Sequence, residues 1–159
     1  MPTCCYVVLC ALLFCGQALS FELKANSALL QDIQQLSDNR MAGRKTAQPG
    51  AELARDYIRL RFSDLGLTAL KPDFQHPFQY SIGFADKQGI NLIASLKGCS
   101  KPDSYIVMTA HYDHLGIGKP DAKGDSIYNG ANDDAAGTTA VMRLAEARRS
   151  ASRRWASSS

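Results

Sequence analysis

Cysteine is nearly absent from most of this 159-residue sequence. Four of its five cysteines fall within the first 15 residues, and only Cys99 stands elsewhere. One cysteine cannot close an internal disulfide, so disulfides and zinc sites of the Cys-x-x-Cys type are both excluded there. Cys99 follows Gly98 and precedes a Lys-Pro pair, a setting that predicts a loop thiol without a role.

Long apolar runs are missing as well. The most apolar stretch, residues 6–19, is shorter than the roughly 20 residues that a membrane-spanning helix needs. It runs into Ala-Leu-Ser, a small-x-small pattern, so residues 1–20 are predicted to be a signal peptide with Phe21 as the first mature residue. The first five residues carry no lysine or arginine, and lipidation of Cys15 stays open. We expect export, to a secreted or periplasmic location.

Negative charge almost disappears toward the end of the sequence. After Asp134 the only acidic residue is Glu146, and no histidine follows His114. Residues 148–159 contain four arginines, and the formal charge is +3 with them and −1 without them. The basic balance therefore does not indicate nucleic-acid binding. We expect this segment to be a disordered Arg/Ser-rich tail that looks like a truncated or frame-shifted end.

Apolar residues recur at helical spacing in two segments, 23–36 and 51–65. The stripe of the second segment consists of Ala54, Tyr57, Ile58, Phe62 and Leu65. The polar, glycine-rich residues 39–50 between the segments predict a loop. Residues 74–84 alternate apolar and polar side chains, which predicts a half-exposed strand, and 90–96 is the next predicted strand.

A short apolar run over residues 105–110 predicts a strand that is buried on both faces. It leads into His111-Tyr112-Asp113. Because side chains alternate along a strand, His111 and Asp113 are expected on the same side and His114 on the other. One ring nitrogen of His111 can then face a metal while Asp113 accepts a hydrogen bond from the other nitrogen and fixes the tautomer.

Two adjacent carboxylates, Asp133 and Asp134, follow the turn dipeptide Asn-Gly and precede a predicted helix over 135–147. A helix N-terminus accommodates carboxylates well, because its free N–H groups and its dipole favour negative charge. Residues 115–128 are expected to form a loop, with Asp125 as a turn carboxylate. The order of elements predicts an α/β fold, a mixed β-sheet flanked by helices.

These stretches resemble the opening motifs of peptidase family M28, the di-zinc aminopeptidases. The resemblance is carried by His-Tyr-Asp-His-Leu-Gly at 111–116 and by Gly-Ala-Asn-Asp-Asp-Ala-Ala-Gly at 130–137. It implies that His111 binds one zinc ion and that Asp113 orients His111. It also implies that Asp133 bridges both zinc ions.

The resemblance implies further properties of the whole site and fold. Asp134 would follow Asp133 through a cis peptide bond. The cofactor would be Zn²⁺, two ions per complete site, the substrate a peptide that loses its N-terminal residue, and the architecture a three-layer sandwich. The Gly-Arg loop at 39–50 is then a family feature and not a phosphate-binding site.

Part of the implied catalytic set is missing from this sequence. In the family a Glu-Glu pair, an aspartate and a final histidine come from later segments. Glu146 lies 13 residues beyond Asp133, about 20 Å away along one helix. We therefore expect residues 21–147 to be the N-terminal portion of the peptidase domain, with the general base absent, weak or no zinc binding, and little activity. The alternatives are a non-catalytic remnant or binding module of the same fold, and a glutaminyl-cyclase-like acyltransferase.

Overall fold

The computed structural model describes residues 27–98 and 104–157. The predicted signal peptide at 1–20 and Cys99 lie outside the described residues, so the expectations about them stay predictions. Within the described residues, no helix has both the length and the apolar character that crossing a bilayer requires.

The two predicted amphipathic helices are confirmed. One helix covers residues 27–36, and the other is α2, Pro49–Asp64. Proline at the first position of α2 suits a helix start, because its missing N–H would have no helical partner there. The predicted stripe of α2 faces the core: Ala54, Ile58 and Phe62 are buried.

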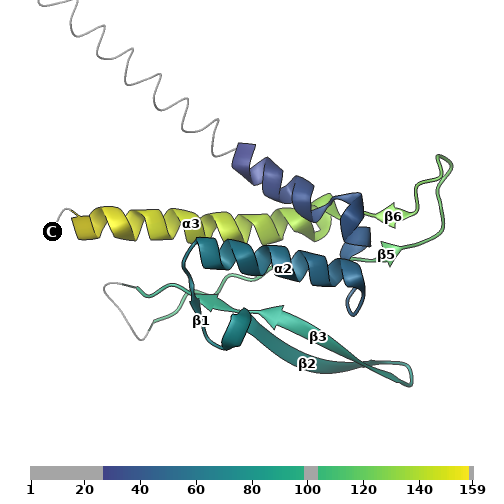
Figure 1. Ribbon diagram of the computed structural model, residues 1–159, viewed down its shortest axis with the longest axis horizontal. Helices are drawn as coiled ribbons and strands as arrows, with labels where there is room; N and C mark the ends of the chain where they lie inside the picture. The colour runs from purple at the N-terminus through teal and green to yellow at the C-terminus, as the bar shows by residue number, and fades with distance from the viewer. Residues whose placement is uncertain (1–26, 99–103, 158–159) are drawn as a thin grey trace, which may run out of the picture.

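The last helix, α3 (Ala136–Ser157), is longer than expected and lies alongside α2 (Figure 1). The prediction of a disordered tail is wrong for residues 148–157, which continue the helix. Alanine and arginine are strong helix formers, and neither glycine nor proline interrupts the sequence after Gly137. The guanidinium of Arg149 also donates a hydrogen bond to the carbonyl of Gly66, just beyond α2. The arginines that suggested disorder therefore extend a helix.

The strands form three separate two-stranded antiparallel ladders within the described residues. The long one is the hairpin of β2 (Gln75–Ile82) and β3 (Ala85–Leu92), in which Ile82 pairs with Ala85 across a two-residue turn. The short ladders pair β1 (Thr68–Ala69) with β4 (Ala94–Ser95), and β5 (Gly116–Ile117) with β6 (Ile127–Tyr128). The α/β class is confirmed, with small antiparallel ladders in place of one mixed sheet.

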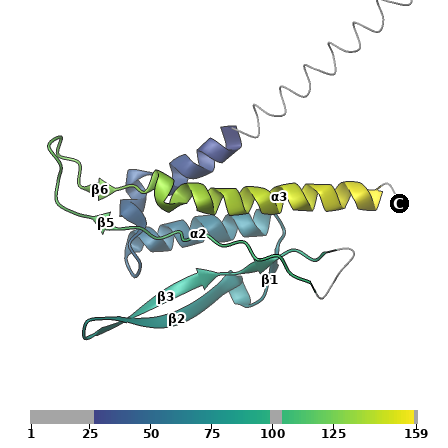
Figure 2. The same cartoon turned by 180° about the vertical axis from the view of Figure 1, so that it is seen from behind.

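Three layers follow one another in both views: α3, then α2, then the β2–β3 hairpin (Figure 1, Figure 2). The core fills the space between them and the helix at 27–36. Phe62 of α2 packs edge-on against Phe74 of η2 (Pro72–Phe74), with ring centroids 5.5 Å apart. The buried cluster consists of Leu36, Met41, Ala54, Ile58, Phe62, Phe74, Ala135 and Met142.

The apolar run at 105–110 is neither a strand nor buried, so that prediction is wrong for this structure. Ile106 is 91% exposed, and its neighbours Tyr105 and Val107 are similarly open. Figure 2 shows the segment as a coil that passes α2 on its way to β5. A strand needs hydrogen-bonding partners along its edges, and no described strand pairs with these residues.

Candidate metal centre

His111, Asp113 and Asp133 come together at the end of this coil. The Nε2 atom of His111 lies 3.0 Å from Oδ1 of Asp133. On the other side of the ring, Nδ1 lies 3.3 Å from Oδ1 of Asp113 and 3.0 Å from the main-chain carbonyl oxygen of Asp113. One ring nitrogen thus faces the acceptor pair on Asp113 and the other faces Asp133. Acceptor oxygens on both sides favour a proton on each ring nitrogen in the absence of a metal, and with a metal at Nε2 the oxygens of Asp113 would keep the proton on Nδ1.

His114 also approaches Asp133, which corrects the expectation that it points away from His111. Its Nδ1 lies 3.6 Å from Oδ2 of Asp133, while His111 approaches the other carboxylate oxygen. The expectation assumed that the strand continues through these residues. Because 111–115 are coil, the alternation of a strand does not apply. The side chain of His114 is only 12% exposed, whereas His111 and Asp133 are open to solvent.

The turn that carries Asp133 is η3 (Ala131–Ala135), a π-helical turn that leads into α3. The peptide bond between Asp133 and Asp134 is cis, as the family resemblance implies. Asp134 points back into the helix start, where its Oδ1 accepts a hydrogen bond from the N–H of Gly137 at 2.8 Å. A Cβ atom at Gly137 would lie 2.1 Å from this oxygen, so only glycine leaves room for the cap. Asp134 therefore serves the helix start, and Asp133 remains at the surface.

Three hydrogen bonds from hydroxyl groups tie residues 111–114, the His111 strip, to three other segments. Thr138 of α3 donates to the carbonyl of His111 at 2.9 Å. The hydroxyl of Tyr112 donates to the carbonyl of Ile90 in β3 at 2.7 Å. The hydroxyl of Thr46 donates to Oδ2 of Asp113, which leaves Oδ1 to face the imidazole. None of these anchors was predicted from the sequence, because each is a single hydrogen bond between residues far apart in the chain.

Arg44 is the other residue that sequence reasoning missed. It lies at the end of η1 (Asn39–Arg44), in the segment predicted to be a loop, and its residue exposure is 0%. Its guanidinium donates to main-chain carbonyls of both segments that carry the candidate ligands. The only sequence signal is an arginine directly after glycine in an otherwise polar loop, and this signal does not separate a buried arginine from a solvated one.

The pKa of His111 reflects opposing influences. Partial burial lowers it, but the Asp113 carbonyl and the carboxylates of Asp113, Asp134 and Asp133 outweigh the burial, so the pKa is raised above 6.5. A raised pKa means that protons compete with a metal ion for this imidazole near neutral pH.

The spacing of the donor atoms suits a shared zinc ion. Two ligand atoms, each bound at the usual distance and at a tetrahedral angle, would lie about 3.3 Å apart, and Nε2 of His111 and Oδ1 of Asp133 are 3.0 Å apart. Among the described residues, no group of three or more histidine, cysteine, aspartate or glutamate side chains is arranged to hold a metal ion. Glu146 instead accepts a hydrogen bond from Arg143 of the same helix at 2.7 Å. The described residues thus fit one metal position in part.

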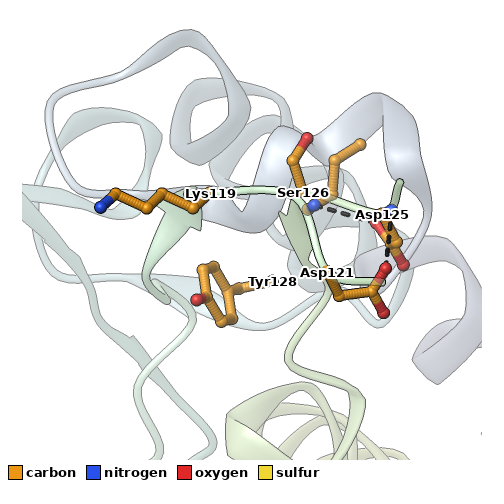
Figure 3. A pocket seen from close by; sticks show the side chains of 6 residues that line it. Lys119, Asp121, Asp125, Ser126 and Tyr128 are labelled. Carbon is orange, nitrogen blue, oxygen red and sulfur yellow. Dashed lines mark hydrogen bonds between the residues drawn. The ribbon is translucent and has the colours of Figure 1, made fainter. Parts of the chain in front are cut away.

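A shallow pocket lies in the loop between β5 and β6, and Figure 3 shows its lining. Its two carboxylates, Asp121 and Asp125, are used by the turn itself. Asp121 accepts from the N–H groups of Lys123 and Asp125, at 2.7 and 3.0 Å, and Asp125 accepts from the N–H of Ile127 at 3.0 Å. The interpretation of Asp125 as a turn carboxylate is confirmed.

Comparison with known proteins gives a family match to this part of the chain and a match to a curated relative. Residues 91–157 match the model of peptidase family M28, a range that contains His111, Asp113 and Asp133. A curated relative, described as a probable zinc metalloprotease of Leptosphaeria maculans, is 42% identical over 55 residues. That alignment covers 35% of this chain and 12% of the relative.

No solved structure matches the chain. The family assignment therefore rests on the sequence matches, and both motifs that carry the resemblance lie inside the matched range. Residues 91–157 are thus similar to peptidase family M28, and both matches support an M28-like metallopeptidase.

Proposed function

We propose that this chain carries part of the site of an exported zinc aminopeptidase, an enzyme that removes N-terminal residues from peptides. The observation that supports it best is the position of the His111 ring, with Nε2 3.0 Å from Asp133 and Nδ1 facing Asp113. The family match and the relative described as a zinc metalloprotease support the metallopeptidase class. The aminopeptidase specificity comes from the family resemblance alone.

The proposed division of labour gives each residue one task. His111 and Asp133 would hold the metal, Asp133 in the bridging role that the family resemblance implies, and Asp113 would keep the proton on Nδ1 so that Nε2 is free. Bound zinc would supply Lewis-acid polarisation of the scissile peptide carbonyl. The side chains of His111 and Asp133 are 54% and 67% exposed, so both are accessible from solvent.

We further propose that this 159-residue chain by itself binds zinc weakly and hydrolyses peptides slowly or not at all. Peptide hydrolysis at a zinc site needs a base that takes the proton from the attacking water. Asp113 is engaged by His111 and Thr46, Asp134 by Gly137, and Glu146 by Arg143. None of these carboxylates is free to act as that base.

The test combines a zinc titration with a peptidase assay. Calorimetric titration of the intact chain with Zn²⁺ is expected to give a weak signal that disappears in His111→Ala and in Asp133→Ala. The matched control is His76→Ala, which removes an imidazole from β2 outside the proposed site. Aminoacyl-nitroanilide hydrolysis with added zinc should stay near background. Robust turnover that Asp133→Ala abolishes would refute the proposed inactivity. Zinc affinity that stays unchanged in both His111→Ala and Asp133→Ala would refute the proposed site.

Export is a separate proposal that rests on residues 1–20. Expressed with these residues in a secreting host, the chain should appear outside the cytoplasm with Phe21 at its N-terminus. N-terminal sequencing of the exported material measures this, and a chain that still begins at Met1 contradicts it.

A further inference from the structure

We propose that Arg44 is a positioning residue of this metal centre: its guanidinium fastens the strip that carries His111 and Asp113 to the turn that carries Asp133. The inference deepens the proposed function and rests on it for the metal. Arg44 itself would contact neither the substrate nor the metal. It acts by fixing the distance between the two proposed ligands.

The hydrogen bonds of the guanidinium join the two segments directly. Nε donates to the carbonyl of Tyr112 at 2.8 Å, between His111 and Asp113 in sequence. Nη1 donates to the carbonyl of Asn129 at 2.6 Å, and Nη2 donates to the carbonyl of Gly130 at 2.8 Å. One planar group thus holds three carbonyls on two chain segments, 68 to 86 residues away from Arg44.

The segment around Arg44 is itself well anchored, so it can act as a fixed support. Nη1 of Arg44 also donates to the carbonyl of Leu36, the last residue of the helix at 27–36. The main-chain carbonyl of Arg44 accepts from the N–H of His114 at 3.1 Å. Asn129 adds a second tie, because its amide donates to the carbonyl of Ser37 at 2.8 Å.

The turn leaves room for the guanidinium only because residue 130 is glycine. Gly130 has a φ of +59°, and a Cβ there would lie 2.4 Å from the carbonyl oxygen of Asp133 and 2.7 Å from Nη2 of Arg44. The turn dipeptide Asn129-Gly130 is therefore fitted to the arginine as well as to its own backbone conformation.

The charge of Arg44 and its hydrogen bonds predict opposite effects on metal affinity when the side chain is removed. Burial lowers the pKa of Arg44, and the carboxylates of Asp113, Asp133 and Asp134 raise it in part, so a cation stands behind the proposed metal position. If its charge dominated, removing it would strengthen metal binding, since two cations repel. If its hydrogen bonds dominate, removing them would weaken metal binding, because the ligand pair would spread apart. Four hydrogen bonds to separate carbonyls favour the second effect.

Arg44→Lys separates the two effects, because lysine keeps the charge but cannot reproduce the planar fork that reaches the separate carbonyls. Arg40→Lys is the matched control: Arg40 also belongs to η1, but its side chain is exposed and pairs only locally, with Asp38. The first readout is calorimetric Zn²⁺ titration of the full chain. The second is amide hydrogen exchange without metal. It tests whether Arg44 holds the two ligand-bearing segments together even if no zinc binds.

In Arg44→Lys we expect zinc affinity to fall at least about tenfold, as for other residues that orient metal ligands. Amide exchange should accelerate selectively at 112–114 and 129–135, while α2 keeps its protection. Arg40→Lys should change neither readout. Unchanged zinc affinity together with unchanged exchange in Arg44→Lys overturns the inference. Tighter zinc binding in Arg44→Ala, which removes the charge, would also overturn it and would assign Arg44 an electrostatic role.

Arg44→Ala provides a second route if Arg44→Lys does not fold. Guanidinium ion at low millimolar concentration, compared with equal sodium chloride, should restore the slow exchange at 112–114 and 129–135 by occupying the vacated space. A folded Arg44→Ala chain that guanidinium leaves unchanged contradicts the inference. If wild-type chain shows no zinc binding at all, the proposed function fails, while the exchange result still decides the role of Arg44.

Discussion

Two segments of this chain that contain apolar residues differ in how far those residues are buried. The helix at 27–36 contributes Leu36 to the buried cluster that it shares with α2 and α3, and Leu36 has no exposed surface. The run at 105–110 is more apolar, yet Ile106 is 91% exposed. A helix satisfies its own main-chain hydrogen bonds and needs neighbours on one face only. A strand buried on both faces needs neighbours at both edges and on both faces.

The difference explains why the site can form although the segment before it is coil. The strip at 111–114 does not depend on a sheet, because hydroxyls and Arg44 hold it from the helical side. The apolar content of a segment therefore sets how much its burial could stabilise the fold. Whether the segment is buried depends on the elements available to pack against it.

The largest expected effect comes from truncating both segments in the same way. Leu36→Ala should lower the free energy of unfolding by about 3 kcal/mol, because it opens a cavity in a fully buried cluster. Ile106→Ala should change it by less than about 0.5 kcal/mol, as for other exposed residues. Urea unfolding measures both. Equal losses of unfolding free energy in the two variants would mean that residues 105–110 are buried in solution, and would contradict the difference between the two segments.

A smaller effect is expected at the polar link between the helices. The carboxylate of Asp32 is buried and accepts from Nη2 of Arg143 at 2.5 Å and from the hydroxyl of Tyr57. Asp32→Asn keeps the shape but weakens these bonds, and should lower the free energy of unfolding by about 2 kcal/mol. Asp38→Asn, at an exposed pair with Arg40, is the control and should be nearly silent. Urea unfolding of both variants measures this. An unchanged free energy of unfolding in Asp32→Asn would contradict a stabilising role for this polar link.

The smallest expected effect is the pH dependence of the metal-free chain. The pKa of His111 is raised in the folded state, so its protonation stabilises the fold. That contribution is complete below the unfolded value of 6.5 and is lost as the pH rises through the higher folded value. The change in Tm should be at most a few degrees, because solvent screens this half-exposed group.

Thermal unfolding of wild type and His111→Asn across this range measures the effect. The Tm difference between them should shrink as the pH rises. Zinc binding should follow the opposite trend and strengthen with rising pH, since the metal needs the neutral imidazole. A Tm difference that grows with pH would reverse the sign and contradict the raised pKa.

The sequence predicted those features that one segment determines by itself. The stripe of α2 and the alternation in β2 are local patterns, and both elements formed where expected. The approach of His111 to Asp133 was also expected, from motifs that stand 22 positions apart. Prediction failed at 105–110 and at His114, where a strand was assumed whose partners are not among the described residues.

Arg44 and the tail illustrate a second limit. Burial of an arginine depends on carbonyls far away in sequence, which no local pattern reveals. The tail was predicted to be disordered from its charge and serine content, although its alanines and arginines favour a helix.

The most direct test of the account is zinc-edge anomalous diffraction from crystals of this chain soaked in excess Zn²⁺. We predict an anomalous peak within bonding distance of both Nε2 of His111 and Oδ1 of Asp133, with Asp113 still facing Nδ1. A peak at the turn carboxylates Asp121 and Asp125, or no peak at His111, would contradict a shared metal position at these two residues.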